Sequence, residues 1–223
     1  MKGLPLPTWG LLALMAMPAS PAAAQPADGL YLMTRSWIGS LEMDVYYFRS
    51  GGVARAPTGT GPDFTQSPAA AKGTYRMHGR RMAIRWSDGR TEEAEFEPSD
   101  RCFRWDARLF CPVKPFAKGA RIGGEFAVSS GGGGGVAQSL TISLTPDGSY
   151  RLRDFLGISP PAPGRSSTGV STHQGTYELS GTALTLRPEG GQPMTAIAFP
   201  YTVRPGVPEP EYLYFNGGML RRQ

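Results

Sequence analysis

A segment built on Gly-Thr-Tyr occurs twice in this chain, and this internal repeat limits the possible folds more than any other feature. Residues 73–84 (GTYRMHGRRMAI) align without a gap on residues 175–186 (GTYELSGTALTL). The shared positions are glycines, Thr, Tyr and apolar residues that alternate with polar ones, as in strands buried on one face. The positions that differ are the polar ones. The repeat therefore predicts architecture and says little about chemistry.

The similarity extends over most of the chain. Gly29 begins a segment that matches the one beginning at Gly124, and the Asp106-Ala107 turn matches Asn216-Gly217, a strong hairpin signal. The sequence predicts an all-β fold of two homologous antiparallel β-meander units. They are expected to be small barrels or barrel-like, related by a pseudo-twofold or joined into one larger assembly. The unit boundaries are 28–117 and 118–223, and each unit is expected to hold six or seven strands.

Three segments rich in turn-forming residues fit this plan, in a chain that contains 30 Gly and 21 Pro. The Ser/Gly run at 129–135 resembles an interdomain linker by composition, but the repeat places it inside the second unit. Segments 56–71 and 155–173 are expected to be long irregular loops. Loops of more than about 12–15 residues are uncommon in compact domains.

The N-terminal segment has the pattern of a secretory signal peptide. Lys2 is followed by an apolar run and then by small residues that end at Ala24. The run is shorter than the ~20 residues that span a bilayer, which disfavours an uncleaved anchor. We expect residues 1–24 to be removed near Ala24, and the mature chain to be periplasmic or extracellular with no transmembrane segment.

Cys102 and Cys111 are the only cysteines. A hairpin that turns at Asp106-Ala107 places them opposite each other as a non-hydrogen-bonded pair, with Cα atoms ~4.5 Å apart. This register predicts a structural disulfide. Metal ligation and redox catalysis are the competing uses. The two histidines, His78 and His173, lie in different units, and the cysteines lack C-x-x-C spacing.

The charge pattern does not favour nucleic-acid binding. The formal net charge is +5, and both signs are scattered along the chain. The closest approach to a basic cluster is a set of arginines in the first unit, which the second unit does not share and which is a weak signal for anionic lipid or glycan. That set is Arg76, Arg80, Arg81, Arg85 and Arg90.

No catalytic arrangement stands out. There is no G-x-S-x-G motif, and the Gly run lacks the Lys-Ser/Thr of a phosphate-binding loop. Glu93, Glu95 and Glu97 share one strand face, which is expected to be solvated. We expect no catalytic residues, no cofactor and no metal site.

Aromatic residues are more suggestive. Most must be core, but a minority can line a ligand cavity, as in barrel interiors. The predicted ligand-binding residues are Trp37, Tyr47, Trp86 and Tyr150.

Taken together, these motifs resemble exported bacterial proteins of unknown function that carry tandem Gly-Thr-Tyr β-repeats and are loosely lipocalin-like. The motifs include the leading Gly-x-Tyr strand at 29–31, the Gly-Thr-Tyr segments and the Asp88-Gly89 hairpin. The resemblance implies a β-barrel-like fold and brings no assigned activity.

Two functions follow as hypotheses. The first is a non-enzymatic exported protein that binds a small apolar or glycan-like ligand. The alternative is a structural or protein-interaction module of the cell envelope without a small-molecule ligand.

Overall fold

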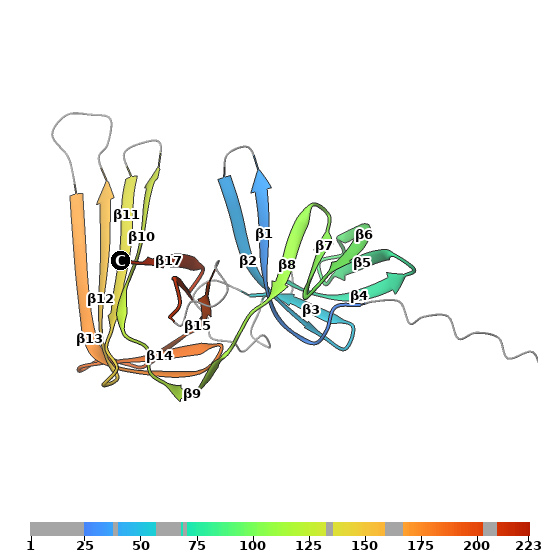
Figure 1. Ribbon diagram of the computed structural model, residues 1–223. Helices are drawn as coiled ribbons and strands as arrows, with labels where there is room; N and C mark the ends of the chain where they lie inside the picture. Colours follow the sequence, from blue (N-terminus) through green and yellow to red (C-terminus); the bar gives the residue numbers. More distant parts are fainter. Residues whose placement is uncertain are drawn as a thin grey trace, which may run out of the picture.

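The computed structural model shows two closed antiparallel barrels that lie side by side (Figure 1). It describes residues 25–37, 40–56, 68, 71–132, 136–158, 167–202 and 209–223. Every regular element of at least four residues in these ranges is a β-strand, which confirms the predicted all-β fold of two barrel-like units. The predicted signal peptide, residues 1–24, lies outside the described residues.

The first barrel contains strands β1 to β8 in sequence order and closes by pairing of β1 with β8. Its strands are β1 (Gly29–Trp37), β2 (Ser40–Arg49), β3 (Gly52–Arg55), β4 (Lys72–His78), β5 (Arg81–Trp86), β6 (Thr91–Ser99), β7 (Cys102–Trp105) and β8 (Arg108–Pro112).

The second barrel contains strands β10 to β17. It closes by pairing of β10 with β17, and β9 adds to β13 from outside. Its strands are β10 (Gly124–Gly132), β11 (Val136–Leu144), β12 (Ser149–Ile158), β13 (Ser167–Gly181), β14 (Ala183–Pro188), β15 (Met194–Tyr201), β16 (Tyr212–Phe215) and β17 (Gly218–Arg222), with β9 at Phe116–Ala120. The chain therefore passes between the barrels at residues 113–115.

The strand count exceeds the six or seven expected per unit. In the first unit, β3 is short and follows β2 after a tight turn at Ser50 and Gly51, whose φ angles are 48° and 81°. Such a turn reverses the chain within two residues. In the sequence, the two strands that flank it therefore resemble one longer strand, which lowers the expected number.

The prediction of an irregular loop at 155–173 was wrong in large part. Strands β12 and β13 pair continuously from Ser149 opposite Thr176 to Ile158 opposite Ser167. The composition of this segment, rich in Ser, Thr and Gly, is typical of a loop. Its backbone N–H and C=O groups are nevertheless paired in the ladder between the two strands. Residues 159–166 and most of the predicted loop at 56–71 lie outside the described residues.

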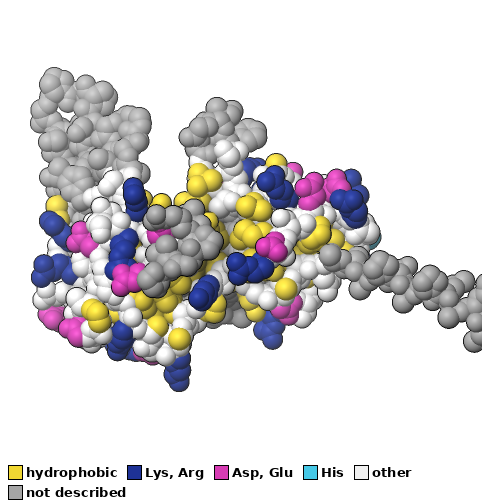
Figure 2. All heavy atoms as spheres, viewed as in Figure 1, with side chains coloured by type: hydrophobic (Ala, Val, Ile, Leu, Met, Phe, Trp, Pro, Cys, Tyr) yellow, Lys and Arg dark blue, Asp and Glu magenta, His cyan; other side chains and the backbone are white. Residues whose placement is uncertain are grey.

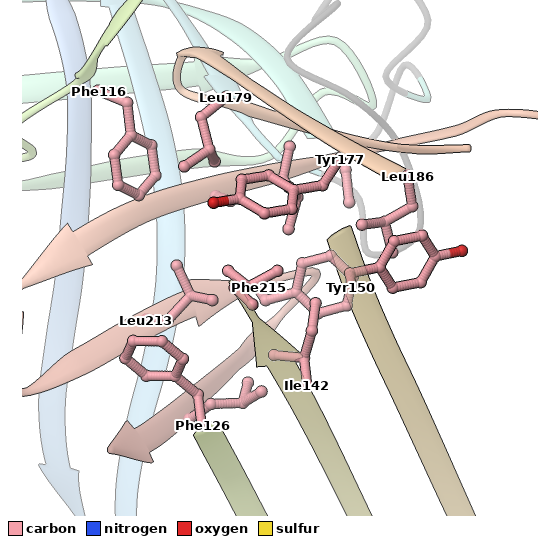
Figure 3. Close-up of a cluster of buried hydrophobic side chains, with 14 residues drawn as sticks. Phe116, Phe126, Ile142, Tyr150, Tyr177, Leu179, Leu186, Leu213 and Phe215 are labelled. Carbon is pink, nitrogen blue, oxygen red and sulfur yellow. The ribbon is translucent and has the colours of Figure 1, made fainter. Parts of the chain in front are cut away.

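Period-two alternation fills each barrel with side chains. On β5, Met82, Ile84 and Trp86 point inward and are at most 4% exposed. The first-barrel core also contains rings from β1, β2, β7 and β8, among them Phe48 and Phe110, which are fully buried. In the second barrel, Phe126 and Ile142 lie in an equivalent core (Figure 3).

The predicted cysteine hairpin is confirmed. Phe103 pairs with Phe110 and Trp105 with Arg108 across β7 and β8, and Cys102 is bonded to Cys111 with Cα atoms 4.3 Å apart. Neighbouring residues Phe103 and Phe110 point into the barrel, so alternation places the disulfide on its outer surface.

A third cluster of buried residues joins the barrels, and we call it the inter-barrel cluster. Leu30, Leu32 and Val45 on the outer face of β1 and β2 contact residues of β15 and β16. Figure 2 shows hydrophobic side chains gathered where the barrels meet. The buried residues from the second barrel are Ile197, Phe199 and Tyr214. These strands are not equivalent in the two repeats, so the contact joins unlike faces.

Candidate functional site

The structure places the four predicted ligand-binding residues in different parts of the molecule. Trp37 ends β1, and its side chain lies outside the described part. Tyr47 packs against the inter-barrel cluster, and Trp86 belongs to the first-barrel core. Tyr150 lies at the edge of the second-barrel core with its hydroxyl pointing away from it (Figure 3). These residues do not form one site.

The described parts of both barrel interiors are occupied by buried side chains. Trp105 and Phe48 are among the largest fully buried side chains of the first barrel, and Phe126 is among those of the second. An eight-stranded barrel is just wide enough for side chains to fill it. A ligand site is therefore expected on the outer surface.

An open pocket of about 330 Å³ lies where β4 begins and β5 ends, and we call it the β4–β5 pocket. It is lined by Lys72, Gly73, Thr74, Arg85, Trp86, Ser87 and Gly89. Gly73 allows the two strands to approach closely, because a Cβ there would lie 2.6 Å from the backbone oxygen of Arg85. The backbone amide of Ser87 donates to the oxygen of Lys72 at 2.8 Å and closes the end of the strand pair.

The pocket is polar and cationic. Thr74 lies directly opposite Arg85 in the β4–β5 register. Lys72 and Arg76 are two residues before and after Thr74, so both are diagonal neighbours of Arg85 on the outer face. Lys72 and Arg85 line the pocket, and Arg76 lies beside it; Thr74, Arg76 and Arg85 are exposed and Lys72 is partly exposed.

The second barrel has the same framework with a different charge. Gly175 pairs with Pro188 as Gly73 pairs with Trp86, and the amide of Glu189 donates to the oxygen of Gln174 at 2.9 Å. Gln174, Thr176, Glu178, Arg187 and Glu189 stand where the first barrel has Lys72, Thr74, Arg76, Arg85 and Ser87.

Contacts within the chain hold the charged groups of this second surface. Arg187 lies 3.6 Å from the Glu178 carboxylate, and Gln174 donates to Glu189 at 3.1 Å. The two equivalent positions therefore share backbone geometry and differ in electrostatics.

Beneath the pocket, a polar cluster fixes the Trp86 ring. The indole Nε1 of Trp86 donates to Glu92 at 2.7 Å, and Arg108 donates to the other carboxylate oxygen at 2.9 Å. Burial alone would raise the pKa of Glu92. The hydrogen bonds from Arg108 and Trp86, with the charge of Arg108, outweigh burial and hold this pKa below its usual range. Glu92 is therefore ionised at neutral pH, and its carboxylate orients the Trp86 ring.

Two features of this region have signals in the sequence beyond the predictions above. Glu92 shares the inward face of β6 with Ala94 and Phe96, so period two separates it from the solvated face of Glu93. Arg85 differs from Arg81 in its contacts on β6. Arg85 lies opposite Thr91, and the Glu93 carboxylate, which is diagonal to both arginines, contacts Arg81.

Other chemistry is sparse in the described ranges. They contain no group of three or more His, Cys, Asp or Glu side chains placed to hold a metal ion. Within the same ranges, no helix has the length and apolar character needed to cross a membrane.

The fold and pocket define the chain as a tandem eight-stranded β-barrel protein with a cationic surface pocket on its first barrel. Comparison with protein-family models, curated proteins and solved structures finds no match.

Proposed function

We propose that this chain is a non-enzymatic exported protein that binds a glycan-like ligand on its outer surface, at the β4–β5 pocket. The observation that carries this proposal is the location of the pocket outside a filled barrel, beside Trp86. A glycan-like ligand fits better than an apolar one, because the solvent-facing polar groups of the pocket are hydroxyls and cationic donors.

Export is part of the same proposal and rests on the N-terminal segment that ends at Ala24. The Cys102–Cys111 disulfide supports it, since disulfides persist mainly in oxidising compartments.

A glycan array that carries neutral, amino and acidic saccharides tests the proposal. Thr74→Trp fills the pocket from an exposed strand position, and Thr176→Trp makes the same change at the equivalent position of the second barrel. We expect the wild type and Thr176→Trp to bind the same saccharides, and Thr74→Trp to lose them. Absence of binding by the wild type, or full binding by Thr74→Trp, would contradict the proposal.

The protein-interaction alternative is supported by the β1–β2 hairpin. Strand β8 pairs with β1 only from Tyr31 to Thr34, so the described part of the hairpin extends beyond its barrel. Leu41 on this extension is 61% exposed and shares a face with Met43, which packs on the inter-barrel cluster. Site-specific photo-cross-linking from position 41 in the intact envelope tests this second function. A single reproducible protein adduct supports it, and adducts no more abundant than those from exposed Gln138 count against it.

A further inference from the structure

We infer that the β4–β5 pocket binds a phosphate group, carried by a soluble sugar phosphate or by a lipid headgroup. The inference rests on the proposed binding function and specifies the charge of its ligand.

Like charges are concentrated on the outer face of β4 and β5. Lys72 and Arg76 flank Thr74, and Arg85 lies opposite it, so each flanking residue is diagonal to Arg85. Long side chains at diagonal cross-strand positions are within reach of one another, and like charges there repel. A bound anion would convert this repulsion into charge-assisted hydrogen bonds.

Neighbouring cations on the same surface pair with acidic side chains of the chain itself. Arg81 contacts Glu93 at 2.7 Å, and Arg90 contacts Asp88 at 2.7 Å. Neither Arg76 nor Arg85 has an acidic partner among the residues that the structure describes. The positive charge without an acidic partner therefore lies on Arg85, in the lining of the pocket, and on Arg76 beside it.

The second barrel serves as an internal reference for these charges. Glu178 replaces Arg76 there and pairs with Arg187, and Glu189 replaces Ser87. The fold therefore does not require positive charge at these positions. The cations belong to the first barrel and to what it binds.

The number and type of groups select phosphate. The two positive charges of Arg76 and Arg85 match a phosphate dianion and exceed the charge of a single carboxylate. Two guanidinium groups offer paired donors that match phosphate oxygens, and the hydroxyls of Thr74 and Ser87 add neutral donors.

The experiment uses the full chain and two probes. Calorimetric titration with glucose 6-phosphate, with glucose as the uncharged reference, tests a soluble source. Sedimentation with phosphatidylcholine vesicles, with and without phosphatidic acid, tests a lipid source. Binding to either phosphate probe over its reference supports the inference and identifies the source. Absence of both overturns it.

Charge variants separate the pocket from net charge. Arg76→Glu copies the second barrel, and Arg151→Glu makes the same charge change at an exposed position on β12. We expect Arg76→Glu to weaken phosphate binding by at least about ten-fold and Arg151→Glu to leave it within about two-fold. Equal losses in both variants, or none in Arg76→Glu, overturn the inference.

Transplantation gives a gain-of-function readout. Gln174→Lys, Glu178→Arg and Glu189→Ser together install the cationic set in the second barrel, and we expect a second phosphate equivalent per chain. Failure of the inference is distinct from failure of the proposed function. Binding of neutral saccharides by the wild type without binding of either phosphate probe would preserve glycan binding and refute phosphate, whereas phosphate binding without saccharide binding would do the reverse.

Discussion

Ala107 adopts the left-handed backbone conformation that Gly217 adopts at the equivalent turn of the second barrel, with φ angles of 56° and 93°. The preceding residues, Asp106 and Asn216, also have positive φ angles, of 51° and 49°. Both turns join the last two strands of their barrels. Only the second has the Asn-Gly pair that this turn favours.

Ala107→Gly is therefore expected to stabilise the first barrel by about 1 kcal/mol, since an L-residue pays roughly 1–2 kcal/mol in this conformation. Chemical denaturation followed by tryptophan fluorescence measures it, because all tryptophans after the predicted leader lie in the first barrel. Gly217→Ala should change the free energy of unfolding of the second barrel by a similar amount in the opposite direction. Equal stability of Ala107→Gly and the wild type would argue against strain at this turn.

Gly73→Ala is expected to destabilise the first barrel by about 1–3 kcal/mol. Its Cβ would lie 2.6 Å from the backbone oxygen of Arg85, and backbone cannot move aside as a flexible side chain can. Gly175→Ala should behave alike, because its Cβ would meet the backbone oxygen of Arg187.

Gly169→Ala is the matched control, since nothing lies within 4 Å of its added Cβ. Thermal melts of the three variants measure the difference. A stability loss in Gly169→Ala as large as in Gly73→Ala would attribute the effect to glycine replacement in strands rather than to close approach.

Glu92→Gln is expected to lower stability at neutral pH by about 1–2 kcal/mol, because it removes the anion that accepts from Trp86 and Arg108. Since the folded-state pKa of Glu92 is depressed, its contribution is present above the unfolded pKa of about 4.3 and is lost as pH falls through the folded pKa. The stability curves of variant and wild type should therefore converge in acid.

Glu93→Gln provides the comparison on the same strand. Glu93 pairs with Arg81, but their side chains are 45% and 58% exposed, so its removal should cost no more than about 0.5 kcal/mol. If denaturation between neutral and acidic pH gave parallel curves for Glu92→Gln and the wild type, the ion pair would not be the cause.

Tyr214 makes the stability of the contact between the barrels depend on alkaline pH. Burial, together with the nearby charge of Asp44, raises its pKa to about 12. Because the unfolded pKa is about 10, its contribution is fully present below that pH and declines as pH rises through the folded value. Tyr214→Phe should remove this part of the alkaline destabilisation and delete the latest-ionising tyrosine from an ultraviolet titration. A titration unchanged by the substitution would refute this assignment.

Local features of the fold were predictable from the sequence. The Cys102–Cys111 pairing follows from one hairpin register, which alternation and the turn at Asp106 determine within a few residues. The inward position of Glu92 is equally local, since period two on β6 is sufficient to assign it. Two closed barrels were also within reach, because the repeat implies that any closure in one copy recurs in the other.

Features that depend on distant segments were not predictable. Leu30 and Leu32 read as apolar residues on a strand, but nothing in β1 indicates that Phe199 covers their outer face. The charge of the pocket also depends on how segments pair in the fold. The arginines are visible in the sequence, but only the β5–β6 register shows that Arg81 has acidic neighbours and Arg85 faces Thr91.

The inter-barrel cluster also determines when, during synthesis, the apolar outer surface of the first barrel becomes protected from aggregation. The first barrel has all its strands once Pro112 has been made, whereas its partner surface comes from β15 and β16, near the end of the chain. A chain that folds from its N-terminus thus holds a finished barrel with an uncovered apolar flank while the second barrel is synthesised. A fragment that stops after β8 would leave this apolar flank exposed to solvent. Strands β15 and β16 therefore protect the first barrel from aggregation.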